Sequence, residues 1–336
     1  MSGLRLSVAV EKLPFAAPFR IAGHVFEDQD AVFVALDDGA HRGRGEAEGV
    51  FYLGEDAPHM VAALEACRGA VEAGIDRAQL QQLLPPGGAR NALDCALWEL
   101  EARRSGRPVW ELAALDPPQP LVTTFTLGAE APARMAEGAR RYAEARALKL
   151  KFTGDHDLDR ARLEAVRAAR PDVWIGVDAN QGYSRAGLEA LVRMLSSCAV
   201  ALLEQPLARG HEAELEGFSS PIPLAADESA LTLADLPGLV GRFQVVNIKL
   251  DKCGGLTEGL AMAREARRLG LKVMVGNMVG SSLAMGPAFV LGQLCDVVDL
   301  DGPTFLKQDR APTVTYAQGM IWCDERVWGR ESSRAS

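Results

Sequence analysis

The sequence predicts an α/β fold in which a barrel of parallel strands follows a smaller α+β domain. The main observation is that short apolar runs alternate with amphipathic stretches from about residue 121 onward, as strands and helices do in a barrel. A second observation is that the preceding residues show strand-like alternation first and helical periodicity afterwards. The length of 336 residues permits either two ordinary domains or one large barrel, so the pattern and not the length decides.

Composition and charge exclude several classes of protein. With 36 basic and 45 acidic residues the net charge is −9, and no run of Lys or Arg is present to neutralise phosphates, so we expect no nucleic-acid partner. No apolar run reaches the roughly 18 residues of a membrane span, and the N-terminus lacks the apolar core of a signal peptide. Together with six singly scattered cysteines, this predicts a cytoplasmic protein with reduced thiols and no membrane partner.

The first domain, residues 1–120, is predicted to be a small antiparallel sheet followed by helices. An Asp-Asp-Gly turn signal at residues 37–39 separates alternating stretches. Later stretches place small and apolar side chains on one face at helical spacing. The predicted elements are strands at 4–12, 31–36 and 43–47 and helices at 57–73 and 89–104.

The second domain, residues 121–318, is predicted to be the barrel, and residues 319–336 either return to the first domain or form a tail. Short connections between alternating strands and helices imply parallel strands with right-handed crossovers. An open doubly wound sheet is the competing architecture, and it lacks the GxGxxG motif of its dinucleotide-binding form. The eight predicted strands are 121–127, 148–152, 173–177, 200–203, 224–226, 245–250, 272–275 and 297–300, with helices at 133–147 and 157–170 among the connections.

Three carboxylates follow three consecutive barrel strands directly. Asp178, Glu204 and Asp227 each stand at the end of an apolar run, one strand–helix unit apart. Because parallel strands end on one rim, where barrel enzymes carry their active sites, we expect these side chains to converge. Converging carboxylates need a compensating charge, and oxygen ligands favour hard divalent cations. The sequence therefore predicts a metal site.

Lysines occupy matching positions on the flanking strands two and six. Lys149 and Lys151 share one strand face, and Lys249 lies within an apolar run, where a lysine is costly unless it is paired or lines a site. Strands two and six lie on opposite sides of the acid-bearing strands. We therefore expect Lys151 and Lys249 to face each other with lowered pKa values as an acid/base pair, and Lys149 to support a carboxylate.

Six motifs in order, LKLKF, DANQGY, EQP, ADES, NIKLDKCGG and VGNM, make the barrel resemble the enolase superfamily in its muconate-lactonizing-enzyme-like subgroup. PFRIA and ARNALDCALWEL resemble that family's capping domain. The resemblance implies a modified TIM barrel, (β/α)7β, with an N-terminal α+β cap. It also implies one Mg²⁺ per active site, with Mn²⁺ as the alternative. The residues it implies are Asp178, Glu204 and Asp227 for the metal, Lys151 and Lys249 for catalysis, and Lys149 and Asn180 in support.

The implied reaction removes the proton α to a carboxylate and passes through an enediolate, whose charge a chelating metal stabilises. Two lysines on opposite faces invert the centre, so we expect an isomerase, a racemase or epimerase of amino acid derivatives. Asp299 and Asp301 share a strand face and resemble the DxD feature with which dipeptide epimerases hold the substrate's α-ammonium group. We therefore predict a Mg²⁺-dependent epimerase of dipeptides with a two-base lysine mechanism. The alternatives are an N-acylamino acid racemase, an o-succinylbenzoate synthase, a cycloisomerase, an acid-sugar dehydratase, and a non-catalytic ligand-binding barrel, which the retention of both lysines disfavours.

The substrate is expected to be a small molecule bound partly by the cap segment 19–28, which we interpret as a loop. In alanyl-glutamate epimerases a basic residue of this loop helps bind glutamate, whereas His24, Val25 and Phe26 stand here. The departure indicates an apolar or different dipeptide, or another amino acid derivative. We also expect a homo-oligomer. The predicted substrate-binding residues are Asp299, Asp301, Met278, His24, Phe26 and Thr126.

Overall fold

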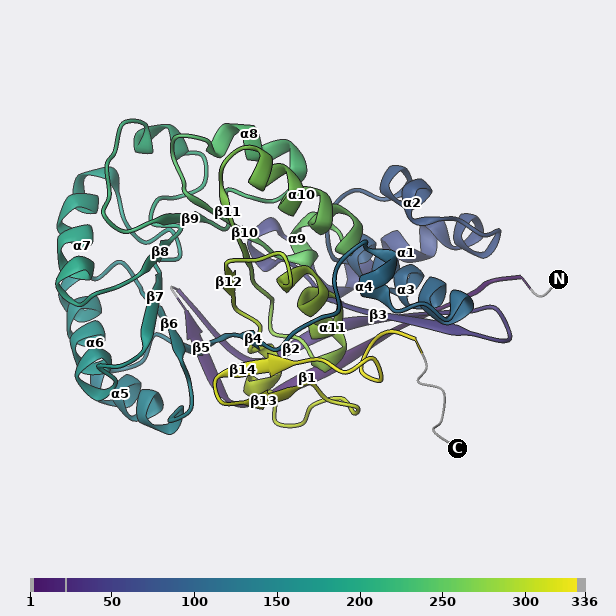
Figure 1. Ribbon diagram of the computed structural model, residues 1–336, viewed down its shortest axis with the longest axis horizontal. Helices are drawn as coiled ribbons and strands as arrows, with labels where there is room; N and C mark the ends of the chain where they lie inside the picture. Colours follow the sequence, from purple (N-terminus) through teal and green to yellow (C-terminus); the bar gives the residue numbers. More distant parts are fainter. Residues whose placement is uncertain (1–2, 22, 331–336) are drawn as a thin grey trace.

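The computed structural model describes residues 3–21 and 23–330 of the chain. Figure 1 shows the barrel on the left and the N-terminal cap on the right, with a long purple hairpin extending from the cap towards the barrel strands. The hairpin end meets the barrel directly, because the N–H of Ala129 donates to the carbonyl oxygen of Arg20 at 2.8 Å. Cap residues are therefore available to a site at the barrel rim.

The cap begins with this long antiparallel hairpin. β1 (Arg5–Ile21) and β2 (His24–Asp37) pair from one end to the other with one irregularity, and β3 (Arg42–Glu48) pairs with the other edge of β2. The prediction that residues 19–28 form a loop is wrong, since pairing continues to Ile21 opposite His24. Gly23, at φ +74°, provides the left-handed conformation that so tight a reversal requires.

Helices cover one face of the cap sheet. The two predicted helices are α1 (Ala57–Glu72) and α3 (Gly88–Ser105). The shorter elements are η1 (Phe51–Leu53), α2 (Arg77–Leu83) and α4 (Val109–Leu112). A Cβ on Gly45 of β3 would lie 1.9 Å from the carbonyl oxygen of Ala92, so α3 can pack this close to the strand because a glycine is present.

The eight barrel strands form one parallel sheet in the order in which they occur along the chain. They are β5 (Thr124–Leu127), β6 (Ala147–Lys151), β7 (Trp174–Asp178), β8 (Leu202–Glu204), β9 (Leu224–Ala226), β10 (Val245–Ile248), β11 (Lys272–Val275) and β12 (Val297–Val298). Side chains link the first and last strands, since Thr124 Oγ1 donates to Asp299 and the N–H of Leu300 donates to Thr123 Oγ1. The predicted barrel with an α+β cap is confirmed.

The connections differ in places from the predicted helices. The helix expected at 133–147 ends at Arg141, and a turn leads from there into β6. The apolar run 245–250 is strand only to Ile248, because Lys249 precedes the first turn of a short helix. The helices are α5 (Pro132–Arg141), α6 (His156–Ala169), α7 (Arg185–Ser197), α8 (Leu236–Leu239), α9 (Leu250–Cys253), α10 (Leu256–Arg268) and α11 (Ser282–Gly292), with 3-10 turns η2 (Glu212–Leu215), η3 (Leu233–Asp235) and η4 (Gly302–Phe305).

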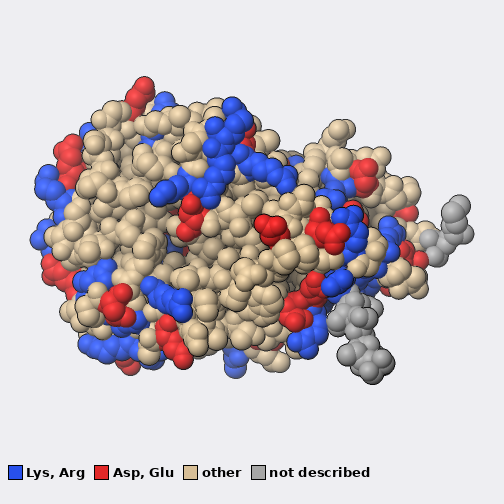
Figure 2. All heavy atoms as spheres, in the orientation of Figure 1, with Lys and Arg blue, Asp and Glu red and all other residues tan. Residues whose placement is uncertain are grey.

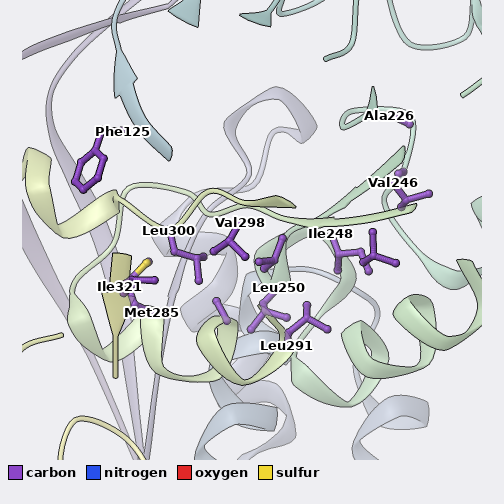
Figure 3. Packing of buried hydrophobic residues seen from close by; sticks show 14 of the residues in the cluster. Phe125, Ala226, Val246, Ile248, Leu250, Met285, Leu291, Val298, Leu300 and Ile321 are labelled. Carbon is purple, nitrogen blue, oxygen red and sulfur yellow. The ribbon is translucent and has the colours of Figure 1, made fainter. Parts of the chain in front are cut away.

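A continuous apolar core lies between the barrel strands and the helices around them. Figure 3 shows Ile248 and Leu250 close to Leu291 of α11, with Val298 and Leu300 beside them. These residues are at most 6% exposed. Burial of this kind is the main stabilising contribution to folding, and it fixes the strand ends that carry the polar residues of the site.

The end of the chain returns to both parts of the molecule. β13 (Thr315–Ala317) and β14 (Met320–Trp322) form a small sheet with β4 (Leu121–Val122). Beyond this sheet, Trp328 Nε1 donates to the carbonyl oxygen of Arg44 in β3 at 3.1 Å. On the face shown in Figure 2, basic and acidic side chains are interspersed. No helix among residues 3–21 and 23–330 is long and apolar enough to cross a membrane.

Candidate active site

The three predicted acids converge at the carboxyl ends of neighbouring strands. Asp178 ends β7, Glu204 ends β8, and Asp227 follows β9 directly. One oxygen from each lies within 4.8 Å of the others, and each residue is at most 1% exposed. The parallel register produces this arrangement, because it places Asp178 opposite Glu204.

Lys149 lies among these acids. Its Nζ is 2.7 Å from Glu204 Oε2, 2.8 Å from Asp299 Oδ2 and 3.6 Å from Asp178 Oδ2. Burial lowers the pKa of Lys149, but Asp299 and Glu204 outweigh burial and hold the pKa well above its ordinary value. The side chain therefore stays charged and holds the carboxylates in place.

Asp227 is paired with two lysines that follow β10. Lys249 Nζ lies 2.7 Å from Asp227 Oδ2, and Lys252 Nζ lies 2.6 Å from Oδ1. Lys252 is buried in α9. Burial lowers the pKa of Lys249, but Asp227 outweighs burial and raises it. The lowered pKa predicted for Lys249 is therefore wrong for this arrangement, because its ammonium group is bonded to a carboxylate.

The acids differ in how well their charges are compensated. Burial raises the pKa values of Asp178 and Asp227, but their lysine partners outweigh burial and hold both pKa values below the ordinary range. For Glu204, burial and the charge of Asp178 raise the pKa to about 7 in spite of Lys149. An added cation would therefore relieve more repulsion at Glu204 than at Asp178 or Asp227.

A cavity of about 600 Å³, measured to its open mouth, lies between the cap and the acids. Lys151 at the end of β6 and Lys249 after β10 both line it, and Asp227 contributes to its lining. In the sheet, β7, β8 and β9 lie between the two lysine-bearing strands. The structure thus brings the two lysines to one cavity from opposite sides of the acids. Lys151 Nζ lies 2.6 Å from Asp178 Oδ2.

Of four further residues predicted for the site, the structure brings three to the cavity. Phe26 and Met278 line the cavity, as does Asn180, whose backbone N–H donates to Asp178. His24 does not line it, and its ring centroid lies 5.0 Å from that of Phe51. His24 shares a strand face with Phe26, and its ring stacks on that of Phe26 with the centroids 6.0 Å apart, so it lies behind the lining and not in it.

Asp299, Asp301 and Thr126 lie outside the cavity lining. Asp299 accepts from Lys149 at 2.8 Å and from Thr124 Oγ1 at 2.5 Å, so both its oxygens have partners. Asp301 accepts from the backbone N–H of Thr126 at 2.6 Å. Burial and the charge of Asp299 raise the pKa of Asp301 to about 7. These contacts tie the last barrel strand to the first.

Sequence reasoning missed several cavity residues. Tyr52 in η1 and Glu228 after Asp227 line the cavity, and each has a buried side-chain oxygen without a hydrogen-bond partner within the described residues. Burial and the charge of Asp227 raise the pKa of Glu228 to about 8. Glu228 carried a signal, because it adjoins a predicted metal ligand. Tyr52 carried none, because it stands in an irregular cap segment with no periodic pattern.

The capped parallel barrel, with an acid triad and two lysines at its rim, defines an enzyme of the enolase superfamily. The family model for the mandelate racemase / muconate lactonizing enzyme N-terminal domain matches residues 5–113, and the enolase C-terminal domain-like model matches residues 133–325. The chain therefore belongs to the mandelate racemase / muconate lactonizing enzyme family, which confirms the predicted resemblance.

Relatives in this family are isomerases. The chain is 40% identical to an L-Ala-D/L-Glu epimerase from Escherichia coli K12, over 94% of this chain and 98% of that protein. It is 42% identical to an N-acetyl-D-glutamate racemase from Pseudoalteromonas, over 76% of this chain and 80% of that protein. A crystal structure of an Agrobacterium tumefaciens enolase family member with bound sodium and L-Ala-L-Glu has a TM-score of 0.92 and 40% identity, covering 97% and 100% of the two chains. The prediction of an isomerase of the racemase and epimerase type is confirmed.

Proposed function

We propose that this protein epimerises dipeptides at the C-terminal residue by Mg²⁺-dependent transfer of the α-proton. The observation that carries the proposal is the pair of lysines that enter one cavity from opposite sides of the acid triad. The C-terminal residue is the reacting one, because it alone has its α-carbon next to a free carboxylate. The E. coli relative and the dipeptide-bound Agrobacterium structure support a dipeptide as the substrate.

The residues of the triad fit a hard divalent cation. They offer three carboxylate oxygens within 4.8 Å of one another, and the raised pKa of Glu204 marks repulsion that a cation would relieve. We propose that Asp178, Glu204 and Asp227 hold Mg²⁺, or Mn²⁺ in its place. When bound, the ion supplies electrostatic stabilisation for the negative charge that develops on the substrate carboxylate.

The lysines move the proton. In the proposed mechanism Lys151 Nζ and Lys249 Nζ face the two sides of the α-carbon. One ammonium must first lose its proton to act as base, and it then takes the α-proton while the opposite lysine returns a proton to the other face. Asp178 and Asp227 hold the two lysines in position in this structure. Positioned proton transfer of this kind contributes roughly 10²–10⁴-fold to rate.

The test is exchange of the α-hydrogen in deuterated water. L,L-dipeptides with Mg²⁺ should incorporate deuterium and invert, and EDTA should abolish both. Lys151→Ala and Lys249→Ala should each lower the rate of inversion by roughly 10²–10⁴-fold. Lys272→Ala, a lysine on the exposed start of β11, is the matched control. Full turnover by Lys151→Ala would disprove the two-base mechanism, and absence of exchange from a broad dipeptide panel would disprove the function.

An N-acylamino acid racemase is the second candidate, favoured by the 42% identity to an N-acetyl-D-glutamate racemase. The two functions differ at the substrate amino group, which is an ammonium only in the dipeptide. We propose that Asp301, supported by Asp299, meets this ammonium. Asp301→Asn should therefore lower kcat/KM for dipeptides by at least ten-fold and have a smaller effect on N-acetyl amino acids. The opposite order would favour the racemase.

A further inference from the structure

We infer that the cap wall of the cavity selects a substrate whose C-terminal side chain is apolar and uncharged, and that Tyr52 donates a hydrogen bond to a carbonyl oxygen of that substrate. The inference rests on the proposed function and deepens it by naming the substrate class. It also departs from the L-Ala-L-Glu bound by the Agrobacterium relative.

Aromatic side chains from separate cap segments form this wall. Phe19 and Phe26 come from paired positions of the β1–β2 hairpin, and Phe51 and Tyr52 come from η1. The ring centroids of Phe26 and Phe51 are 5.4 Å apart, and those of Phe51 and Tyr52 are 5.3 Å apart, both in edge contact. Phe51 is still 36% exposed although it is a large apolar residue. Such a surface gains free energy when an apolar group covers it.

The positively charged side chains of the cavity already pair with carboxylates. Among the described residues that line it, the positively charged ones are Lys151 and Lys249, and each is bonded to an acid of the triad. Arg20, in the same hairpin, pairs with Glu130 at 2.9 Å instead. A carboxylate on the substrate side chain would therefore lose its hydration without gaining a counter-charge.

Tyr52 supplies a neutral donor in this wall. Its Oη is buried and has no hydrogen-bond partner within the described part of the chain, yet the residue lines the cavity. A buried hydroxyl without a partner is costly, so a ligand that accepts its hydrogen bond is favoured. A peptide carbonyl is a neutral acceptor of that kind. Apart from Tyr52 and Gln29, the cap residues that line the cavity are apolar.

The geometry of the α-carbon directs the side chain to this wall. In the proposed complex the carboxylate lies at the acid triad, and the two lysines take the two faces of the α-carbon. The amide nitrogen and the side chain remain, and the acids Asp299 and Asp301 lie on the barrel side, towards β5 and β12. The side chain therefore points to the cap.

The first experiment compares L-Ala-L-Leu, L-Ala-L-Phe and L-Ala-L-Glu with the Mg²⁺-loaded protein, by deuterium exchange at the C-terminal α-carbon. We expect kcat/KM for the two apolar substrates to exceed that for L-Ala-L-Glu at least ten-fold. An equal or higher value for L-Ala-L-Glu would overturn the inference and leave the proposed function standing. Absence of exchange with every dipeptide would overturn both.

The second experiment uses variants of the wall, with L-Ala-L-Ala as an internal reference for folding and chemistry. Phe26→Ala should reduce kcat/KM for L-Ala-L-Leu about ten-fold, and for L-Ala-L-Ala much less. Val25→Ala, an exposed neighbour outside the cavity lining, is the matched control and should change neither. Equal loss on both substrates in Phe26→Ala would contradict the side-chain subsite.

The third experiment isolates the phenol. Tyr52→Phe keeps the ring and removes the donor, so kcat/KM should fall roughly three- to ten-fold for all dipeptides while the preference among side chains is kept. An unchanged rate in Tyr52→Phe would overturn the role of the hydroxyl.

The fourth experiment adds the missing cation. Phe26→Arg should raise kcat/KM for L-Ala-L-Glu relative to L-Ala-L-Leu at least ten-fold. An unchanged ratio in Phe26→Arg would overturn the charge argument.

Discussion

Lys149 illustrates how much of the site depends on single charges. It lies within 3.6 Å of three buried carboxylates, so its removal leaves them without that compensation. We expect Lys149→Met to lower the free energy of unfolding in EDTA by about 3 kcal/mol, as when one partner of a buried ion pair is removed. Mg²⁺ supplies part of the lost charge, so it should stabilise the variant more than the wild type. Urea unfolding in EDTA and in Mg²⁺ measures both effects.

The control for this prediction is Lys307→Met, because Lys307 is exposed. It should change stability by less than about 0.5 kcal/mol in either condition. A Lys149→Met variant as stable as the wild type in EDTA would show that other lysines already compensate the triad.

Residues at regular strand positions could be predicted from the sequence, and others could not. Asp178, Glu204 and Lys151 were predicted at this rim because strand periodicity and strand ends place them there whatever the loops do. Tyr52 reaches the same cavity from an irregular segment of the cap, and no periodic pattern encodes that approach. Asn247 donates to Glu204 at 2.7 Å and shares the face of Lys249, so the same periodicity would have found it.

At the scale of elements, the packing of β3 against α3 depends on glycine. A Cβ on Gly45 would lie 1.9 Å from the carbonyl oxygen of Ala92, and backbone cannot move aside cheaply. We expect Gly45→Ala to destabilise the protein by about 3 kcal/mol or more, because strand and helix must separate. Thermal unfolding with far-UV circular dichroism measures this.

The matched control carries the same substitution with the opposite expected sign. Gly69 lies inside α1, and nothing lies within 4 Å of the Cβ that it lacks. Gly69→Ala should therefore stabilise the protein by roughly 0.5–1 kcal/mol through helix propensity. Equal effects of the two substitutions would contradict the close approach of β3 to α3.

The contact between β3 and α9 contains buried acids and should respond to pH. Asp251 accepts from the N–H of Glu48 at 3.1 Å and from Asn91 at 2.9 Å, and burial raises its pKa to about 7. The folded protein holds this proton more tightly than the unfolded chain does. The resulting stabilisation is therefore complete below the unfolded pKa of about 3.9, and it is lost as the pH rises through about 7.

Asp251→Asn keeps a hydrogen-bond acceptor and removes the titration. Between about pH 5.5 and pH 8.5, we expect the wild type to lose about 2 kcal/mol more stability than this variant does. Urea unfolding at the two pH values gives the difference. Asp157→Asn, at an exposed carboxylate, should follow the wild type. Parallel pH profiles for wild type and Asp251→Asn would show that Asp251 does not titrate in this range.

Elements with one dominant periodicity were predicted well, and their ends were not. The sequence pattern indicates a loop at residues 19–28. The structure instead pairs the two sides of this segment with each other across a tight turn, from Phe19 opposite Phe26 to Ile21 opposite His24. The apolar run 245–250 is a strand only to Ile248, because a helical turn begins at Leu250, and Lys249 between them still has an extended backbone. Such boundaries are decided by tertiary contacts that local sequence does not encode.

At the scale of the whole molecule, cap and barrel contribute complementary parts of one site. The barrel rim supplies the acids and lysines, and the cap supplies the aromatic wall, so the proposed catalysis depends on the position of the cap relative to the barrel. The last part of the chain helps to hold this relative position. Arg44 of the cap donates to the carbonyl oxygen of Val327 at 2.8 Å, and Glu99 accepts from the N–H of Gly329 at 3.1 Å.

Trp328 allows a test of this coupling. It is 3% exposed, and it donates to the carbonyl oxygen of Arg44. It also packs closely on Gly286 of α11, since a Cβ added to this glycine would lie 2.5 Å from the Cβ of Trp328. Trp328→Ala should therefore cost about 3–5 kcal/mol and should weaken the joint unfolding of cap and barrel. Trp322→Ala, at an exposed tryptophan of β14, should cost much less. Calorimetry should give one transition for the wild type and for Trp322→Ala, and a broadened or split transition for Trp328→Ala. A single sharp transition in Trp328→Ala would mean that direct contacts between α3 and the barrel couple the two parts without the C-terminal segment.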